Sequence, residues 1–294
     1  MSGCVESIGN RVFLIPPKGV LEKLRNIILA KLSGGERKLV GGLEVPCYRP
    51  MLIELVVDDA CSVCPYAIEF VVELAASCNF ITVKIYNMSY VEPPFPVQAT
   101  TTFRVNERVL WVGIPITGDF KVIEEYLKEA YIETHPELEK LVEKLKQFAE
   151  LYNLFRNPND DQFKQLLYKL LVNIDRYGYP YCPCRPIKIP RPSASREEMY
   201  ELNKDKVCPC IYALTDVKLH GHCLCGLFWS KEAVDRYING RATKYGYALK
   251  AIEDIEKVYN YRELRIRVLT GGARKYLESW IRKLEELYMM LPED

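Results

Sequence analysis

The sequence predicts an α+β protein of several domains, in which an α/β domain is followed by a mainly helical, cysteine-rich domain. Up to about residue 134, apolar residues switch between the alternating pattern of strands and the spacing of helices. From Pro136 onward they recur at helical spacing alone. The chain has 294 residues, which is long enough for about two domains.

Six elements account for the predicted α/β domain. The first helix of the domain is expected to hold Pro65 in its first turn, where proline is tolerated because the N–H that it lacks would be unpaired. A tight turn at Asn106-Glu107 separates the last two strands. The expected order is strand, helix, strand, strand, strand and helix: residues 51–58, the helix that follows Cys64-Pro65, and residues 80–86, 102–105, 109–112 and 120–131.

The sequence predicts mainly helices from Pro136 to the end of the chain. Apolar stripes run from Leu138 to Phe148 and from Phe163 to Leu171, with a break at Asn157-Pro158-Asn159. A loop-rich segment with six cysteines follows, and then further helix with a break at residues 270–272 and a last stripe that ends at Leu287. We expect an N-terminal extension over residues 1–45, an α/β domain over 46–134, a helical domain over 135–230 and a C-terminal helical extension over 231–294.

The charge balance argues against several classes of partner. Lysine and arginine total 40 against 39 aspartate and glutamate residues, so no global field favours nucleic acid or an anionic membrane. No apolar stretch approaches the roughly 18 to 20 residues of a membrane-spanning helix, and the N-terminus lacks the layout of a secretion signal. We therefore expect a cytoplasmic protein that binds neither nucleic acid nor membrane.

The eleven cysteines are the unusual part of the composition. Eight of them fall in two groups, which is typical of metal or redox chemistry, whereas structural disulfides are rare in a reducing cytosol. Intracellular disulfides of a heat-adapted protein are the alternative. Cys4, Cys47 and Cys78 stand alone and have no assigned role, although Cys78, at the end of a predicted helix, fits a small buried residue.

The first group is the Cys-x-x-Cys of Cys61 and Cys64, which follows a predicted strand and opens a helix. Free N–H groups and the helix dipole at that end favour a thiolate, so Cys61 is the expected nucleophile and Cys64 the resolving thiol. Half of a zinc site has the same spacing, but no second pair or histidine lies nearby in sequence. We therefore favour redox chemistry.

Residues 51–133 resemble a thioredoxin or glutaredoxin-like domain, especially the Cys-x-x-Cys-Pro type of archaeal disulfide oxidoreductases. The stretch from Val97 to Gly113 follows the register of that family. Thr101 occupies the position where the family normally has a cis-proline beside the dithiol. The resemblance implies a thioredoxin fold with a redox-active dithiol.

The second group consists of three Cys-x-Cys pairs, Cys182/Cys184, Cys208/Cys210 and Cys223/Cys225. Six cysteines exceed the four that a 4Fe-4S cluster or a structural zinc needs, so two are left over. Soft thiolates suit iron-sulfur chemistry, and surplus thiols beside a cluster suggest that its electrons reach a disulfide.

The same residues resemble the catalytic subunit of ferredoxin:thioredoxin reductase over about residues 137–230. The similarity rests on the segments 176–185, 208–210 and 222–228 and on Asn157-Pro158. The resemblance implies that Cys182, Cys208, Cys210 and Cys223 ligate a 4Fe-4S cluster and that Cys184 and Cys225 form the active disulfide.

The family's histidine lies between the last two cysteines, where this chain has Leu224. His222 is the nearest candidate to protonate or stabilise a leaving thiolate, and a plain surface role is equally open. His220 is the other candidate nearby.

The resemblance predicts an oxidoreductase that acts on disulfides. Electrons would pass from ferredoxin, or a similar one-electron donor, through the cluster and Cys184/Cys225 to a thioredoxin-like or other disulfide protein, with Cys61/Cys64 as an optional internal relay. The alternative is a metal-holding scaffold or maturation factor whose thioredoxin-like domain binds a partner, and Thr101 gives that alternative some support.

Overall fold

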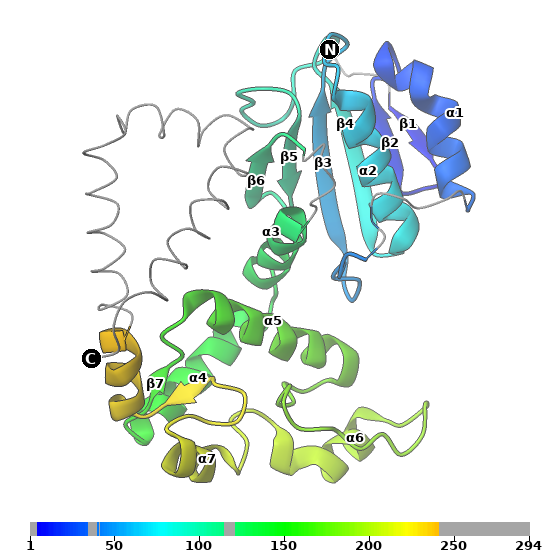
Figure 1. Cartoon of the computed structure of the whole chain (residues 1–294). Coiled ribbons are helices and arrows are strands. Elements are labelled where there is room, and N and C mark those ends of the chain that lie inside the picture. Colours follow the sequence, from blue (N-terminus) through cyan, green and yellow to red (C-terminus); the bar gives the residue numbers. More distant parts are fainter. Residues whose placement is uncertain (1–4, 35–39, 41, 115–120, 241–294) are drawn as a thin grey trace, which may run out of the picture. The chain divides into compact units, whose positions relative to one another are not determined.

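The computed structural model describes residues 5–34, 40, 42–114 and 121–240 (Figure 1). The contacts divide the chain after Phe228 into two units. Of the second unit, the described residues 231–240 are helical. The predicted break at residues 270–272 and the stripe that ends at Leu287 lie outside the described residues. None of the described helices is long and apolar enough to cross a membrane.

A six-stranded sheet forms the first half of the larger unit, in the order β1-β2-β4-β3-β5-β6 (Figure 1). The central strands β2, β4 and β3 are parallel, whereas β1, β5 and β6 join antiparallel. The strands are β1 (Glu6–Ile8), β2 (Val12–Ile15), β3 (Met51–Val57), β4 (Ile81–Asn87), β5 (Thr102–Val105) and β6 (Val109–Val112). The four strands predicted from residue 51 onward are therefore present in the predicted order.

Strands β1 and β2 were not predicted, and they lie within the segment expected to be an N-terminal extension. They are only three and four residues long, too short for a clear periodic signal. Val12 and Leu14 are fully buried, and β2 pairs in parallel with β4. The segment therefore contributes apolar residues and two strands to the same sheet.

Three helices accompany the sheet. They are α1 (Val20–Leu32), α2 (Cys64–Ser77) and α3 (Lys121–Glu133). Helix α1 packs on α2, α2 packs on β3 and β4, and α3 packs on β6. Helix α2 has nine buried residues, so the segment behind the Cys-x-x-Cys is anchored in the core.

The second half of the larger unit is mainly helical, as predicted. Its elements are α4 (Leu138–Leu151), β7 (Phe155–Arg156), α5 (Asp160–Tyr177), α6 (Arg196–Asn203), η1 (Lys204–Lys206) and α7 (Ala213–His220). The two-residue strand β8 (Phe228–Trp229) includes the last residue of this unit and the first of the next. The side chain of Asn159 caps α5 by accepting from the Gln162 N–H, and Gly178 ends this helix at φ 86°. Together with the sheet, these helices confirm the predicted α+β class.

Cys47 and Cys78 form a disulfide that was not predicted from the sequence. Cys78 is buried as expected, but it is bonded to Cys47 rather than being an isolated apolar residue. The two cysteines are separated by 31 positions, and such a spacing carries no motif.

Candidate active site

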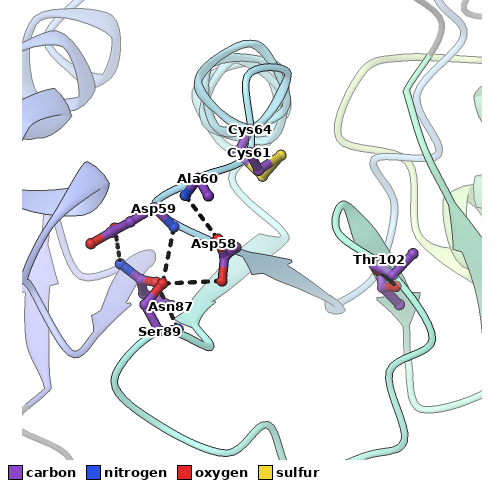
Figure 2. Close-up of a disulfide and its surroundings, with 9 residues drawn as sticks. Asp58, Asp59, Ala60, Cys61, Cys64, Asn87, Ser89 and Thr102 are labelled. Atoms are coloured by element: carbon purple, nitrogen blue, oxygen red, sulfur yellow. Dashed lines mark hydrogen bonds between the residues drawn. A yellow bond between two sulfur atoms is a disulfide. The ribbon is translucent and has the colours of Figure 1, made fainter.

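The Cys-x-x-Cys lies where β3 leaves the sheet, and its two cysteines form a disulfide (Figure 2). Their Cα atoms are 5.4 Å apart. Cys64 is fully buried, whereas Cys61 is partly exposed. An approaching thiolate can therefore reach Cys61 more readily than Cys64.

The helix behind the disulfide begins at Cys64, so the expectation that Cys61 itself opens it is wrong by three residues. The Cys61 N–H donates to the carbonyl oxygen of Asp58 at 3.2 Å in a turn, and Pro65 occupies the first turn of α2. Because Pro65 has no N–H to donate to the carbonyl oxygen of Cys61, the helical hydrogen bonds do not continue back through the turn. The turn and the helix therefore remain separate.

Asp59, two positions before Cys61, ties the turn to its neighbours (Figure 2). Its carboxylate accepts the Asn87 side-chain amide at 2.8 Å, the bond that Figure 2 shows. It also accepts the Val20 N–H and the Tyr90 hydroxyl, each at 2.8 Å. These hydrogen bonds, led by that of Val20, lower the pKa of Asp59. The turn is thus held against the start of α1 and the end of β4.

Thr101, at the position that the family gives to a cis-proline, follows a cis peptide bond with Thr100. Its carbonyl oxygen accepts the Gly113 N–H at 2.7 Å. The side chain is fully buried, and its hydroxyl has no hydrogen-bond partner among the described residues. Thr102, the next residue, begins β5 (Figure 2).

The first two Cys-x-Cys loops are joined through their backbones. The Cys182 N–H donates to the carbonyl oxygen of Lys206, and the Cys208 N–H donates to that of Pro180, both at 2.8 Å. An isolated antiparallel bridge between Tyr181 and Val207 lies between these two bonds. Residues far apart in the sequence are thereby brought to one place.

Asn157 holds the third loop. Its side-chain amide donates to the carbonyl oxygen of Gly226 at 2.8 Å, and its backbone N–H donates to that of Leu227 at 3.1 Å. Inside the loop, the Cys223 N–H donates to the carbonyl oxygen of Phe228 at 2.9 Å. The Asn-Pro segment between α4 and α5 thus positions the last cysteine pair.

The thiols of the three loops meet. Cys182 contacts the thiols of Cys210 and Cys225, and the sulfur atoms of Cys223 and Cys225 lie 3.5 Å apart. Cys225 also interacts with the thiol of Cys184. The four proposed ligands Cys182, Cys208, Cys210 and Cys223 are buried, with 3 to 7% of their surface exposed. Cys184 is exposed and Cys225 is half-buried.

The neighbouring thiols shift one another's pKa values. Hydrogen bonds from Cys210 and Cys225 lower the pKa of Cys182, whereas burial and the neighbouring charges of Cys182 and Cys223 raise the pKa of Cys208. Burial, followed by the same two charges, also raises the pKa of Cys184. Because adjacent thiolates repel one another, a cation bound beside these thiols would favour the ionisation of all of them.

The donor set suits iron and sulfur. Cysteine thiolates are the usual ligands of 4Fe-4S clusters, and backbone N–H groups point at three of the sulfur atoms. Phe228 donates to Cys223 at 3.2 Å, Cys184 donates to Cys182, and Tyr212 donates to Cys210. Within the described part of the chain, however, no three potential ligands converge as they would on one metal ion.

The histidines differ in their surroundings. The Nδ1 atom of His222 lies 2.9 Å from the carbonyl oxygen of Cys223. His220 is exposed at the end of α7. Two further residues of the site, Arg185 and Asp216, are joined by an ion pair at 2.6 Å. No sequence signal marks this pair, because its partners are 31 positions apart.

An oxidised dithiol beyond the end of β3 and a second group of neighbouring thiols define a protein of thiol and disulfide redox chemistry. Residues 132–248 match the family model described as ferredoxin thioredoxin reductase catalytic beta chain. This match confirms the resemblance predicted from the cysteine pairs and identifies the family to which this part of the chain is similar.

Solved structures show weaker likeness. The alkylhydroperoxide reductase protein AhpF of Enterococcus faecalis, in a mutant form, is 15% identical with a TM-score of 0.31, over 40% of this chain and 57% of that one. A domain of the same protein has a TM-score of 0.30 at 15% identity over the same shares of both chains. A Sulfolobus solfataricus protein is 19% identical with a TM-score of 0.29, over 38% of this chain and 70% of that one. No curated protein matches the chain in sequence.

Proposed function

We propose that the chain is an iron-sulfur disulfide reductase of the ferredoxin:thioredoxin reductase type, working in the cytoplasm. In this proposal Cys182, Cys208, Cys210 and Cys223 hold a 4Fe-4S cluster, and Cys184 and Cys225 form the redox-active pair. The donor is ferredoxin or a similar one-electron carrier, and the acceptor is a thioredoxin-like or other disulfide protein. The observation that carries the proposal is that the three Cys-x-Cys loops meet, with four of their six thiols buried.

Each proposed role follows from the surroundings of the thiol. A bound cluster would supply one-electron chemistry that cysteine side chains alone lack. The buried thiols and the backbone N–H groups directed at them would hold and orient that cluster. Exposed Cys184 is the thiol that can meet a protein disulfide, while half-buried Cys225 resolves the mixed disulfide.

The reduction balances as a dithiol-disulfide exchange. The Cys184 thiolate attacks one sulfur of the target disulfide, and the other target sulfur leaves as a thiolate and is protonated. Cys225 then attacks the Cys184 sulfur, which forms the Cys184–Cys225 disulfide and releases the second target thiol. Two electrons reach the target in this exchange, and two electrons from the donor restore the dithiol.

The proposed internal acceptor is the Cys61–Cys64 disulfide. Cys61 is the accessible sulfur of that pair, so a mixed disulfide between Cys184 and Cys61 is the expected intermediate. A Cys64→Ser, Cys225→Ser double variant lacks both resolving thiols. When its Cys61 is first activated as a mixed disulfide with thionitrobenzoate, the Cys184 thiolate should displace thionitrobenzoate and accumulate as the Cys184–Cys61 disulfide. If no Cys61 adduct can be trapped and Cys61→Ser leaves the reduction of external thioredoxin unchanged, the relay is wrong.

Anaerobic purification tests the main proposal. We expect a brown full-length protein with about four iron atoms per chain, whose colour is lost in Cys208→Ser. The variant Cys184→Ser should keep its iron but no longer reduce thioredoxin with reduced ferredoxin. A colourless protein that carries one zinc would instead support the scaffold function. If the Cys184→Ser variant is brown and still fully active in reducing thioredoxin, the assignment of Cys184 and Cys225 as the redox pair is wrong.

A further inference from the structure

The carboxylate of Asp216, on α7, joins two of the cysteine loops. Its Oδ2 atom accepts a hydrogen bond from the Arg185 guanidinium at 2.6 Å and from the Leu224 N–H at 3.2 Å. Arg185 directly follows Cys184, and Leu224 directly precedes Cys225. One oxygen atom therefore links the residues next to both thiols of the proposed redox pair.

We propose that Asp216 is a positioning residue that sets the equilibrium between the dithiol and the disulfide of Cys184 and Cys225. The inference rests on the proposed function, in which these two cysteines form the redox pair. Holding the two loops together before the bond forms reduces the conformational entropy lost when it closes. The link should therefore favour the disulfide over two free thiols.

The surroundings of Arg185 make the link more than a surface ion pair. The two charged side chains are only 21% and 16% exposed, so solvent screens them less than a pair on the surface. The guanidinium also lies over the Tyr212 ring, 4.2 Å from its centre, and interacts with the Cys210 thiol. Arg185 is thus held from three sides.

Tyr212 is fixed in turn. Its hydroxyl donates to Asp205 at 2.6 Å, and this bond holds the ring beneath the guanidinium. The proposed link therefore consists of Asp216 and Arg185, with Tyr212 as their support.

The equilibrium can be measured without ferredoxin. In glutathione buffers, Cys184 and Cys225 lose two electrons and two protons as their disulfide forms, and one glutathione disulfide becomes two glutathione thiols. Alkylation of the full-length chain, followed by mass spectrometry of the linked peptide, separates this bond from Cys61–Cys64 and Cys47–Cys78. The readout does not depend on turnover of the enzyme.

We expect Asp216→Ala to lower the equilibrium constant for the Cys184–Cys225 disulfide about tenfold, which corresponds to about 30 mV for two electrons. Asp216→Asn keeps an acceptor for the Leu224 N–H but loses the ion pair, so its equilibrium constant should lie between those of the wild type and Asp216→Ala. Arg185→Met should match Asp216→Asn, and Arg185→Lys should restore part of the loss. Lys218→Ala, at an exposed position on the same helix, is the matched control.

The outcomes separate the two proposals. A wild-type chain that forms no Cys184–Cys225 disulfide at any glutathione ratio would overturn the proposed redox pair itself. A wild-type chain that forms it, with the same constant in Asp216→Ala, would overturn only the positioning role. If Asp216→Ala does not fold, Asp216→Asn and Arg185→Met decide the question in the same assay, and unchanged constants in both would count against the link.

Discussion

Cys47 and Cys78 are joined by a disulfide whose Cα atoms lie 5.5 Å apart. Cys78 caps the end of α2, where its N–H donates to the Leu74 carbonyl oxygen at 3.1 Å. The bond therefore fastens the segment before β3 to the helix that begins at Cys64. This places a covalent constraint at the end of α2 opposite the redox disulfide.

We expect the double variant Cys47→Ala, Cys78→Ala to lose roughly 3 to 4 kcal/mol of unfolding free energy, because the oxidised chain closes a loop of 31 residues in the unfolded state. Urea unfolding of both proteins measures the difference. The matched control is Cys61→Ala, Cys64→Ala, which opens a loop with a separation of three and should cost less. Equal losses in the two double variants would contradict this account.

Gly19 lies at the start of α1 with φ 62°, and a Cβ atom built on it would lie 2.2 Å from both carboxylate oxygens of Asp59. Gly19→Ala should therefore lower the unfolding free energy by about 2 kcal/mol or more, since both the backbone conformation and the contact are unfavourable. Gly9→Ala is the matched control, because φ is 60° there and the nearest atom is 3.6 Å away. The control should lose only the backbone contribution, about 1 kcal/mol. Equal losses of unfolding free energy in Gly19→Ala and Gly9→Ala would show that the Asp59 side chain moves away from the new Cβ atom at no cost.

The sequence predicted those parts of the fold whose signals are local. The strand and helix order from Met51 to Glu133 followed from apolar periodicity, and the stripes before and after Asn157 became α4 and α5. The grouping of the cysteines pointed to thiol chemistry because their spacing is short. Strands β1 and β2 were missed, since three or four residues do not establish a period.

The contacts that the sequence did not predict depend on tertiary structure. The disulfide of Cys47 and Cys78 and the ion pair of Arg185 and Asp216 each join residues 31 positions apart. Neither pair belongs to a motif, and a single aspartate on a short helix is normally a solvated residue. The roles of the individual cysteines in holding a cluster and exchanging disulfides stay predictions.

Glu54 is buried on β3 with 2% of its surface exposed, and it pairs with Arg104 at 2.6 Å. It also accepts the Tyr86 hydroxyl at 3.2 Å, and burial raises the pKa of Tyr86 to about 12. We expect Arg104→Met to cost roughly 3 to 5 kcal/mol of unfolding free energy, because it leaves a buried carboxylate without its partner. Urea unfolding at neutral pH measures the loss.

The double variant Glu54→Gln, Arg104→Met distinguishes a lost charge partner from lost packing. Because glutamine at position 54 carries no charge, the double variant has no unpaired buried carboxylate. It should therefore recover most of the unfolding free energy lost in Arg104→Met. A double variant as unstable as the single one would mean that the contact of Arg104 with the Phe95 ring, 4.0 Å from its centre, matters more than the charge.

His135 is 4% exposed, and its Nδ1 accepts the Glu137 N–H at 3.1 Å. Burial is the largest cause that lowers its pKa, with the charge of Arg49 acting in the same direction and Asp175 opposing both. Protonation of the ring at Nδ1 would also break the bond from Glu137. The folded chain therefore binds this proton more weakly than the unfolded chain, whose histidine has a pKa of about 6.5.

The sign of the pH dependence follows from that difference. At a pH well above 6.5 the ring is neutral in both states, and it contributes no slope. As the pH falls below about 6.5, the unfolded state takes up the proton first, so His135 destabilises the fold until the pH passes its lowered folded pKa. The slope from this one group is at most about 1.4 kcal/mol per pH unit.

We expect His135→Asn, which keeps an acceptor for the Glu137 N–H, to lose less unfolding free energy than the wild type between about pH 7 and pH 5. Urea unfolding at half-unit pH intervals measures the difference. His220→Gln, at an exposed position at the end of α7, should follow the wild-type curve. A His135→Asn curve parallel to the wild type throughout this range would mean that the buried imidazole does not resist protonation, and the stability loss at low pH would then have to come from other groups.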